Sequence, residues 1–124
     1  PDGLFVPVLR DVANRDAEDL RAGLDRLRAD VLNRSIPPRE LMGATITLSN
    51  YGTLFGRYAS PVVVPPQVAI VGAGVIRDQV VAVDGQPVVH RILPLSLTVD
   101  HRAVTGGEAA RFLKALVTDL QLAE

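Results

Sequence analysis

His101 stands at a position where a titratable ring could take part in chemistry. It follows the apolar run LPLSLTVD, lies between Asp100 and Arg102, and precedes the paired Gly106 and Gly107, which open a helical pattern. Imidazole titrates near neutrality, so at the end of a strand it suits proton transfer as a general base. The same position also suits a histidine that only hydrogen-bonds to the main chain, and the spacing leaves both interpretations open.

The charges on either side of His101 predict an ion pair rather than a catalytic relay. Side chains alternate between the two faces of a strand, so strand geometry would put Asp100 and Arg102 on one side and His101 on the other. Asp100 would then pair with Arg102, or with another chain, and hold the turn in shape. It would not orient His101 as the carboxylate of a hydrolase triad does.

Nucleophiles and metal ligands are scarce in this sequence. There is no cysteine, which excludes disulfides, zinc-thiolate sites and thiol nucleophiles together. Ser49, Ser60 and Ser96 lack the G-x-S-x-G context of a serine nucleophile. Residues 72–74 read GAG, but further strand-like sequence follows them, so the dinucleotide-binding fingerprint is not met. We therefore expect no metal site and a direct transfer between two substrates.

Composition and charge exclude several classes of partner. The 124 residues are 48% hydrophobic and 22% charged, as in ordinary globular domains. Thirteen basic and fourteen acidic side chains give a net charge of −1, which offers no electrostatic footprint for nucleic acid or an anionic membrane. No apolar run approaches the roughly 18 residues of a membrane span. The absence of cysteine fits a cytoplasmic protein, which is the location we expect.

The elements that must position His101 follow from hydrophobic periodicity. The sequence predicts the order β-α-β-β-β-β-α, an α+β fold in which helices cover a largely antiparallel or mixed sheet. Asn14 or Asp16 is expected to cap the first helix. Asp84-Gly85 is a strong hairpin signal, and His90 lies inside that hairpin as a structural or exposed residue. The expected strands are residues 4–12, 44–49, 62–76, 78–92 as a hairpin, and 93–100, and the expected helices are residues 13–34 and 106–122.

The apolar surface exceeds what these elements cover. Continuous runs such as QVAIVGAGVI need cover on both faces of a sheet, and two helices supply little of it. The sequence shows neither an internal repeat nor a linker that divides it. We expect further chain, or association with other copies, to complete the core.

Four segments, in the same order along the chain, resemble those of one enzyme family. The signature DHRxxDG closes the catalytic domain of dihydrolipoamide acyltransferases, the core components of 2-oxo-acid dehydrogenase complexes, and residues 100–107 resemble it with DHRAVTGG. Three further segments of that family are similar to GLFVPVLRDV, GATITLSNYG and PVVVPPQVAIVGAG. By this resemblance, residues 1–124 match the C-terminal part of the acyltransferase catalytic domain, roughly half of it.

The resemblance implies a chloramphenicol acetyltransferase-like fold, in trimers whose active sites lie between subunits and which assemble into larger cores. It implies acyl transfer between coenzyme A and a dihydrolipoamide, the lipoyl group being carried on a domain outside this chain. The implied partners are the 2-oxo-acid decarboxylase and dihydrolipoamide dehydrogenase components. The sequences TLSN and VVVPPQVAI are closer to those of branched-chain relatives, which favours a branched acyl group.

The family's functional residues carry over to three positions. His101 matches the general base that takes the proton from the attacking thiol. Ser49 matches the hydroxyl that bonds the oxyanion, and it would come from the neighbouring subunit. Thr105 replaces the aspartate or asparagine found four residues after the histidine; it can donate a hydrogen bond but carries no charge, so capping of the last helix competes with a catalytic role.

Two other functions are compatible with parts of this pattern. A non-catalytic assembly core would keep the same fold, with Thr105 as a sign of relaxed selection, but the intact His101 and Ser49 count against it. Antibiotic acetylation on the related fold would favour HHxxxDG, whereas Asp100 occupies the position of the first histidine. The TLSN segment also favours the lipoyl family.

Overall fold

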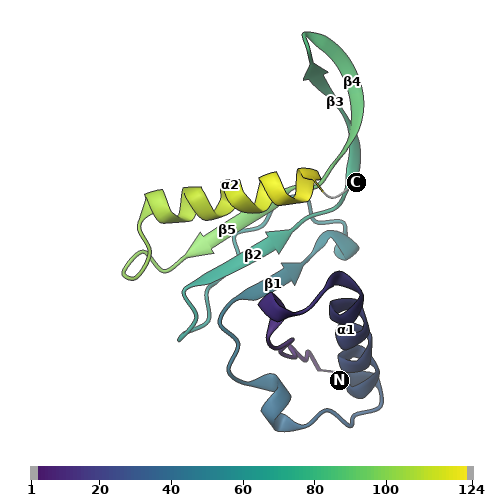
Figure 1. Cartoon of the computed structure of the whole chain (residues 1–124), viewed down its shortest axis with the longest axis vertical. Helices are drawn as coiled ribbons and strands as arrows, with labels where there is room; N and C mark the ends of the chain where they lie inside the picture. The colour runs from purple at the N-terminus through teal and green to yellow at the C-terminus, as the bar shows by residue number, and fades with distance from the viewer. Residues whose placement is uncertain (1–2, 123–124) are drawn as a thin grey trace. The chain divides into compact units, whose positions relative to one another are not determined.

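The computed structural model describes residues 3–122 and contains two compact units, which are described separately (Figure 1). The first unit runs to Ala44 and the second begins at Thr45. This boundary follows Gly43, where the sequence changes from a charged helical pattern to one rich in β-branched residues. None of the described helices is both long and apolar enough to cross a membrane.

The first unit is built around helix α1 (Ala17–Leu32), with short 3-10 turns at Val12–Asn14 and Pro38–Leu41. Of the two predicted caps, Asp16 is the one that caps α1: its carboxylate accepts a hydrogen bond from the Asp19 N–H at 2.8 Å. This bond satisfies one of the main-chain donors left free in the first turn of a helix. The predicted helix and its Asp16 cap are thus confirmed, although the helix spans Ala17–Leu32 rather than residues 13–34.

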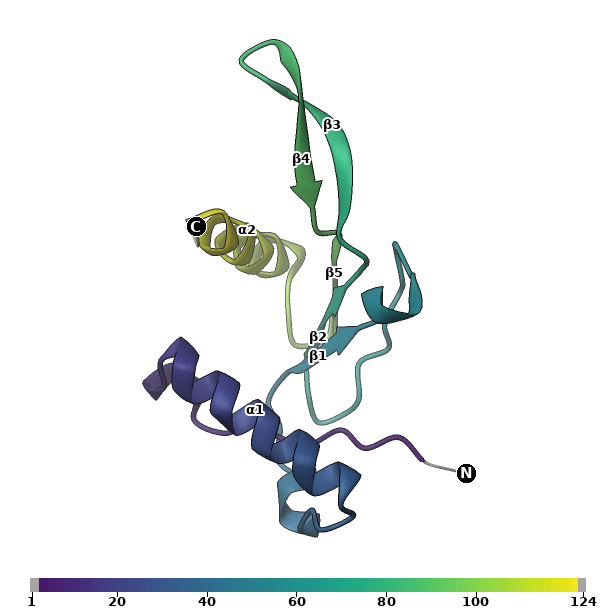
Figure 2. The ribbon, with the colours of Figure 1, turned by 90° about the vertical axis from the view of Figure 1, so that its right-hand side faces the viewer.

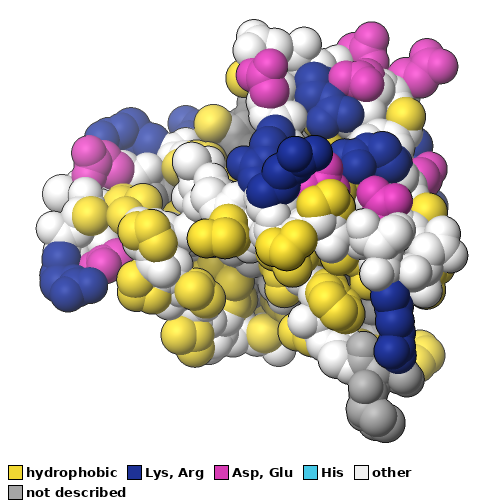
Figure 3. Space-filling model, turned by 90° about the horizontal axis from the view of Figure 1, so that it is seen from below, with side chains coloured by type: hydrophobic (Ala, Val, Ile, Leu, Met, Phe, Trp, Pro, Cys, Tyr) yellow, Lys and Arg dark blue, Asp and Glu magenta, His cyan; other side chains and the backbone are white. Residues whose placement is uncertain are grey.

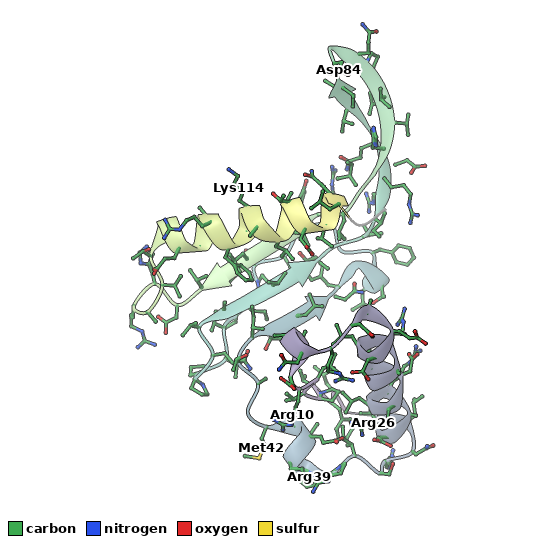
Figure 4. All side chains as sticks on the ribbon, in the orientation of Figure 1. Arg10, Arg26, Arg39, Met42, Asp84 and Lys114 are labelled. Carbon is green, nitrogen blue, oxygen red and sulfur yellow. The ribbon has the colours of Figure 1, made fainter. Side chains whose placement is uncertain are left out.

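Helix α1 has one apolar side and one charged side. Leu27, on the apolar side, is only 1% exposed. On the charged side Arg26 pairs with Asp30 at 3.1 Å and, beyond the helix, with Glu40 at 3.2 Å (Figure 4). More than half of the Arg26 side chain is exposed, so these pairs are a solvated surface feature of small energetic weight.

Residues 4–12 do not form the predicted strand, and that prediction is wrong. Pro7 has no N–H to offer a ladder, and the neighbouring Val8 N–H bonds to the Glu40 carbonyl at 2.7 Å. The segment is held by a side chain instead: the Arg10 guanidinium donates to the carbonyls of Arg39 and Met42, the latter at 2.7 Å (Figure 4).

The second unit contains a three-stranded mixed sheet. Strand β2 (Ala69–Ala73) is central; β1 (Thr47–Asn50) pairs with it in parallel and β5 (Leu95–Val99) pairs with it antiparallel. The strand predicted over residues 62–76 is thus confined to its second half, because Pro65 and Pro66 cannot donate to a ladder. Helix α2 (Gly106–Leu122) follows β5 and lies along one side of the sheet (Figure 1).

A separate two-stranded hairpin joins β2 to β5. Strands β3 (Arg77–Val83) and β4 (Gln86–Ile92) pair antiparallel around Asp84 and Gly85, both of which have positive φ, as the predicted tight turn requires. Figure 2 looks along α2 and shows the hairpin projecting away from the three-stranded sheet. His90 is exposed on β4, opposite Gln79.

The two faces of the sheet differ in what they carry. Alternation along β2 and β5 puts Ala69, Leu97 and Val99 on the side of α2. The opposite face carries hydroxyls and a glycine, the row of partners Ser49, Gly72 and Ser96. The serine hydroxyls of the strands therefore lie on the face of the sheet that α2 does not cover.

Much apolar surface is left open. Among residues 3–122, the buried apolar side chains are Leu27, Ile70 and Val71, and no residue of α2 is buried. Figure 3 shows many hydrophobic side chains at the surface of the described residues. A chain with so little buried apolar area cannot offset the conformational entropy of folding by itself, so the described residues need cover from other protein.

Candidate active site

His101 lies in a tight turn between β5 and α2. The strand ladder is extended by one bond, from the Asp100 N–H to the Val68 carbonyl at 2.8 Å, and then stops. The Asp100 carbonyl accepts from the N–H groups of Ala103 and Val104, at 3.0 and 2.9 Å, which closes the turn over His101. The imidazole is exposed at this turn.

The predicted pairing of Asp100 with Arg102 is confirmed, although it is made through a turn rather than along a strand. The Asp100 carboxylate accepts from the Arg102 main-chain N–H and Nε, both at 3.0 Å, and from Nη2 at 2.8 Å. These bonds, the side-chain ones first, lower the pKa of Asp100 from 3.8 to about 2 and raise the pKa of Arg102. Asp100 therefore stays ionised and holds the turn, as an orienting group for the backbone on either side of His101.

Thr105 caps helix α2 in a reciprocal arrangement with Glu108. The Glu108 carboxylate accepts from the Thr105 main-chain N–H at 2.8 Å and from the Thr105 hydroxyl at 2.7 Å, and that hydroxyl accepts from the Glu108 N–H at 3.3 Å. This is a capping box, which satisfies donors at the start of the helix. The bond from the Thr105 main chain, followed by that from its hydroxyl, lowers the pKa of Glu108.

His101 is thus held between two fixed points. On its N-terminal side the Asp100–Arg102 pair fixes the turn, and on its C-terminal side the capping box of Thr105 and Glu108 fixes the start of α2. The backbone that carries the exposed imidazole is therefore already ordered, so it need not be ordered when the ring meets another molecule.

Ser49 lies in a row of residues across the sheet. It is the register partner of Gly72 on β2, and Gly72 is the partner of Ser96 on β5. Directly opposed residues have side chains on the same face, so both hydroxyls lie on the face away from α2. The Ser96 hydroxyl is bonded to the hydroxyl of Tyr51 at 3.2 Å.

Within one chain Ser49 and His101 do not come together. Two strand spacings of about 4.8 Å separate Ser49 from β5, and the three residues from Ser96 to Val99 add about 10 Å along that strand. The distance across the strands and the distance along β5 are at right angles, so the Ser49 main chain lies about 14 Å from the end of β5. The turn that carries His101 begins only after that point. Thr105 lies four residues beyond His101, at the start of the helix.

A hollow of about 280 Å³ lies behind the His101 turn, between α2 and the sheet. Its walls come from β2, β5, the turn residues Ala103 and Val104, and Phe112 of α2. Glu108 is the one charged side chain at this hollow, and the capping box already uses its carboxylate. Within residues 3–122 no group of three or more histidine, aspartate or glutamate side chains is arranged to hold a metal ion.

Two contributors to the site were not singled out from the sequence. Glu108 had a usable signal, because TGGE fits the pattern of a threonine followed three residues later by glutamate that marks a capping box. Tyr51 had none, because its contact with Gly72 and Ser96 depends on the register of three strands.

The second unit thus combines an α+β fold with a histidine turn after an antiparallel strand and a row of two serines and a glycine on the open face of the sheet. The family model for 2-oxoacid dehydrogenases acyltransferase (catalytic domain) matches residues 1–124. The chain belongs to this family, as the four sequence segments predicted.

Among curated proteins, the chain is 40% identical over 115 residues to the lipoamide acyltransferase component of the branched-chain alpha-keto acid dehydrogenase complex of Pseudomonas aeruginosa, covering 93% of this chain and 27% of that protein. It is also 40% identical over 117 residues to the dihydrolipoyllysine-residue acetyltransferase component of the pyruvate dehydrogenase complex of the same organism, covering 94% of this chain and 21% of that protein. The chain therefore spans about a quarter of the length of these relatives.

Among solved structures, dihydrolipoamide acetyltransferase of Azotobacter vinelandii superposes with a TM-score of 0.88 at 36% identity, over 94% of this chain and 48% of that one. That structure concerns the role of a serine, a histidine and an asparagine in the catalytic mechanism, the histidine 52 positions after the serine and the asparagine four after the histidine. The cubic core of a pyruvate dehydrogenase multienzyme complex superposes with a TM-score of 0.86 at 36% identity, over 92% of this chain and 47% of that one. The α+β fold is that of these catalytic cores.

Proposed function

We propose that this chain forms part of an enzyme that transfers an acyl group between dihydrolipoamide and coenzyme A. One observation carries the proposal. Ser49 and His101 are 52 positions apart and Thr105 follows four after His101, the same spacing as the serine, histidine and asparagine of the Azotobacter enzyme. The serine and the histidine have the same spacing in two chains of the same fold. This supports the same roles for Ser49 and His101 as for the serine and histidine of that enzyme.

The proposed reaction is a thioester exchange. The His101 imidazole accepts the proton of the attacking thiol, whose sulfur forms a bond to the acyl carbonyl carbon. The Ser49 hydroxyl donates a hydrogen bond to the oxyanion of the tetrahedral intermediate. When the intermediate collapses, the bond to the second thiol breaks and that thiolate takes the proton back from the imidazolium, so no proton is gained or lost overall.

The separation of Ser49 from His101 supports a site shared between two copies of the chain. The sheet register keeps the Ser49 main chain about 14 Å from the end of β5, after which the His101 turn begins. A serine from one copy and a histidine from another therefore supply the two roles. Self-association of this kind would also cover the open apolar surface, and the likeness to a cubic core supports assembly beyond a trimer.

The acyl group and the other components are proposed from the sequence. The chain is equally similar, at 40% identity, to a branched-chain and to a pyruvate complex component of one organism. The sequences TLSN and VVVPPQVAI favour the branched-chain type, and we propose that type. Its proposed partners are a lipoyl domain, a 2-oxo-acid decarboxylase and a dihydrolipoamide dehydrogenase. Its proposed location is the cytoplasm.

Complementation between inactive variants tests the proposal. In the full-length protein, acyl transfer from acetyl-CoA and isobutyryl-CoA to dihydrolipoamide should fall about 10²–10⁴-fold in His101→Ala and about 10²–10³-fold in Ser49→Ala. His90→Ala, the other histidine, is the matched control and should keep full activity. Particles assembled from a mixture of the two inactive variants should regain activity, because some sites then contain an intact serine and an intact histidine.

Two results would count against this function, and a third against the shared site. A mixture that stays inactive would refute the site shared between two copies. Unchanged turnover in His101→Ala would remove the general base. A wild-type protein that assembles fully but transfers no acyl group would favour a non-catalytic assembly core.

A further inference from the structure

Tyr51 fixes the end of the strand that carries Ser49. It is the first residue after β1, and its N–H continues the ladder to the Ala73 carbonyl at 3.1 Å. Its own carbonyl accepts from the N–H groups of Leu54 and Gly56, at 3.1 and 3.2 Å, and so starts the short turn that follows. The main chain of Tyr51 is therefore tied both to β2 and to the loop beyond.

The ring of Tyr51 lies flat in a space that two glycines leave open. A Cβ at Gly72 would be 2.7 Å from the ring Cε1 and 3.1 Å from the ring hydroxyl, and a Cβ at Gly56 would be 2.8 Å from Cδ2. Any side chain at either position would push the ring away. The hydroxyl reaches across Gly72 to the partly buried Ser96 Oγ at 3.2 Å.

This placement makes the ring the immediate neighbour of Ser49. Gly72 is the register partner of Ser49, so the ring that covers Gly72 occupies the sheet surface one strand spacing, about 4.8 Å, from the Ser49 main chain and on the same face as its side chain.

We infer that Tyr51 is a positioning residue for Ser49: its ring, seated on Gly72 and anchored by the bond to Ser96, holds β1 and the Ser49 hydroxyl in the orientation that an oxyanion requires. This inference rests on the proposed function, since it gives Tyr51 a role through the serine and no contact with substrate. An oriented donor is effective because it needs no reorganisation when charge develops.

The test is a mutant cycle in the full-length protein, with acyl transfer from acetyl-CoA to dihydrolipoamide as the assay. Tyr51→Phe keeps the ring and removes the bond to Ser96, and Ser96→Ala removes the same bond from the other side. Each should lower kcat about fivefold, as expected for one neutral hydrogen bond, with KM for both substrates unchanged. In a Ser49→Ala background, Tyr51→Phe should cause no further loss, because the group it positions is gone.

Tyr58→Phe is the matched control, because Tyr58 is 71% exposed and its ring lies beside the Arg57 guanidinium. It should leave kcat unchanged. Full activity in Tyr51→Phe, or an equal loss with and without the Ser49 hydroxyl, would overturn the inference while leaving the proposed function intact. Full activity in Ser49→Ala would instead overturn the proposed role of the serine, and the inference with it. If Tyr51→Phe assembles poorly, Ser96→Ala decides, since it leaves the ring in place.

Discussion

Replacement of Thr105 by alanine should loosen the first turn of α2 while leaving the rest of the second unit folded. The threonine hydroxyl makes two of the three bonds of the capping box, as acceptor from the Glu108 N–H and as donor to the Glu108 carboxylate. The third bond, from the Thr105 main-chain N–H, survives the substitution. Because the box is only partly lost, we expect the ordinary cost of an N-cap replaced by alanine, about 1 kcal/mol.

Hydrogen exchange of the full-length protein measures this effect where it occurs. A local loss of about 1 kcal/mol corresponds to roughly fivefold faster exchange of the amides at the start of α2, the Glu108 N–H above all. The amides of the β3–β4 hairpin provide the internal reference and should not change. Thr105→Ser, which keeps a hydroxyl in the same place, should restore slow exchange.

The same variants separate capping from catalysis. If Thr105 acts by holding the His101 turn, kcat should follow the exchange rate, and Thr105→Ser should recover both together. Exchange at Glu108 that is unchanged in Thr105→Ala would refute the capping assignment. Loss of activity in Thr105→Ser despite restored protection would show that the threonine does more than cap.

The structure makes two further predictions. Gly72→Ala should destabilise the full-length protein by about 1–3 kcal/mol through overpacking, since its Cβ would lie 2.7 Å from the Tyr51 ring; Gly106→Ala, whose Cβ would meet nothing within 4 Å, is the control, and equal denaturation midpoints for the two would contradict the packing. The pKa of Asp100 is depressed from 3.8 to about 2, so the stability it contributes is present above pH 3.8 and is lost as the pH falls toward 2. Wild type should therefore lose more stability than Asp100→Asn between pH 5 and pH 2 in urea titrations, and parallel curves would refute the ion-pair assignment.

The parts of the fold that depend on local sequence were predictable. The hairpin follows from Asp84-Gly85, the start of α1 follows from Asp16, and the pairing of Asp100 with Arg102 follows from two opposite charges that are two residues apart. In each case the residues that interact lie within a few positions of one another, so no tertiary information is needed.

The parts that depend on distant pairing were not predictable in the same way. The apolar composition of residues 4–12 indicates a strand, but a strand needs a partner strand. The Val8 N–H bonds instead to the carbonyl of Glu40, which lies in a 3-10 turn. The contact of Tyr51 with Ser96 joins residues that are 45 positions apart. The family resemblance implied that Ser49 and His101 meet across a subunit boundary, and the register of the three strands supplies the physical reason, because it keeps Ser49 far from the end of β5 within one chain.

The contrast between the hairpin and the sheet has a consequence for how the chain folds. The hairpin register pairs Val83 with Gln86 and propagates outward from the turn, so it closes short loops at low entropic cost. The row that contains Ser49 must instead join residues 49, 72 and 96, each about two dozen positions from the next. The chain must close both long loops before Tyr51 can bond to Ser96 across Gly72, so the hairpin and helices should form early and the serine row late. Mutations in the hairpin should accordingly slow folding more than mutations of equal cost in residues 50–68, which should mainly speed unfolding.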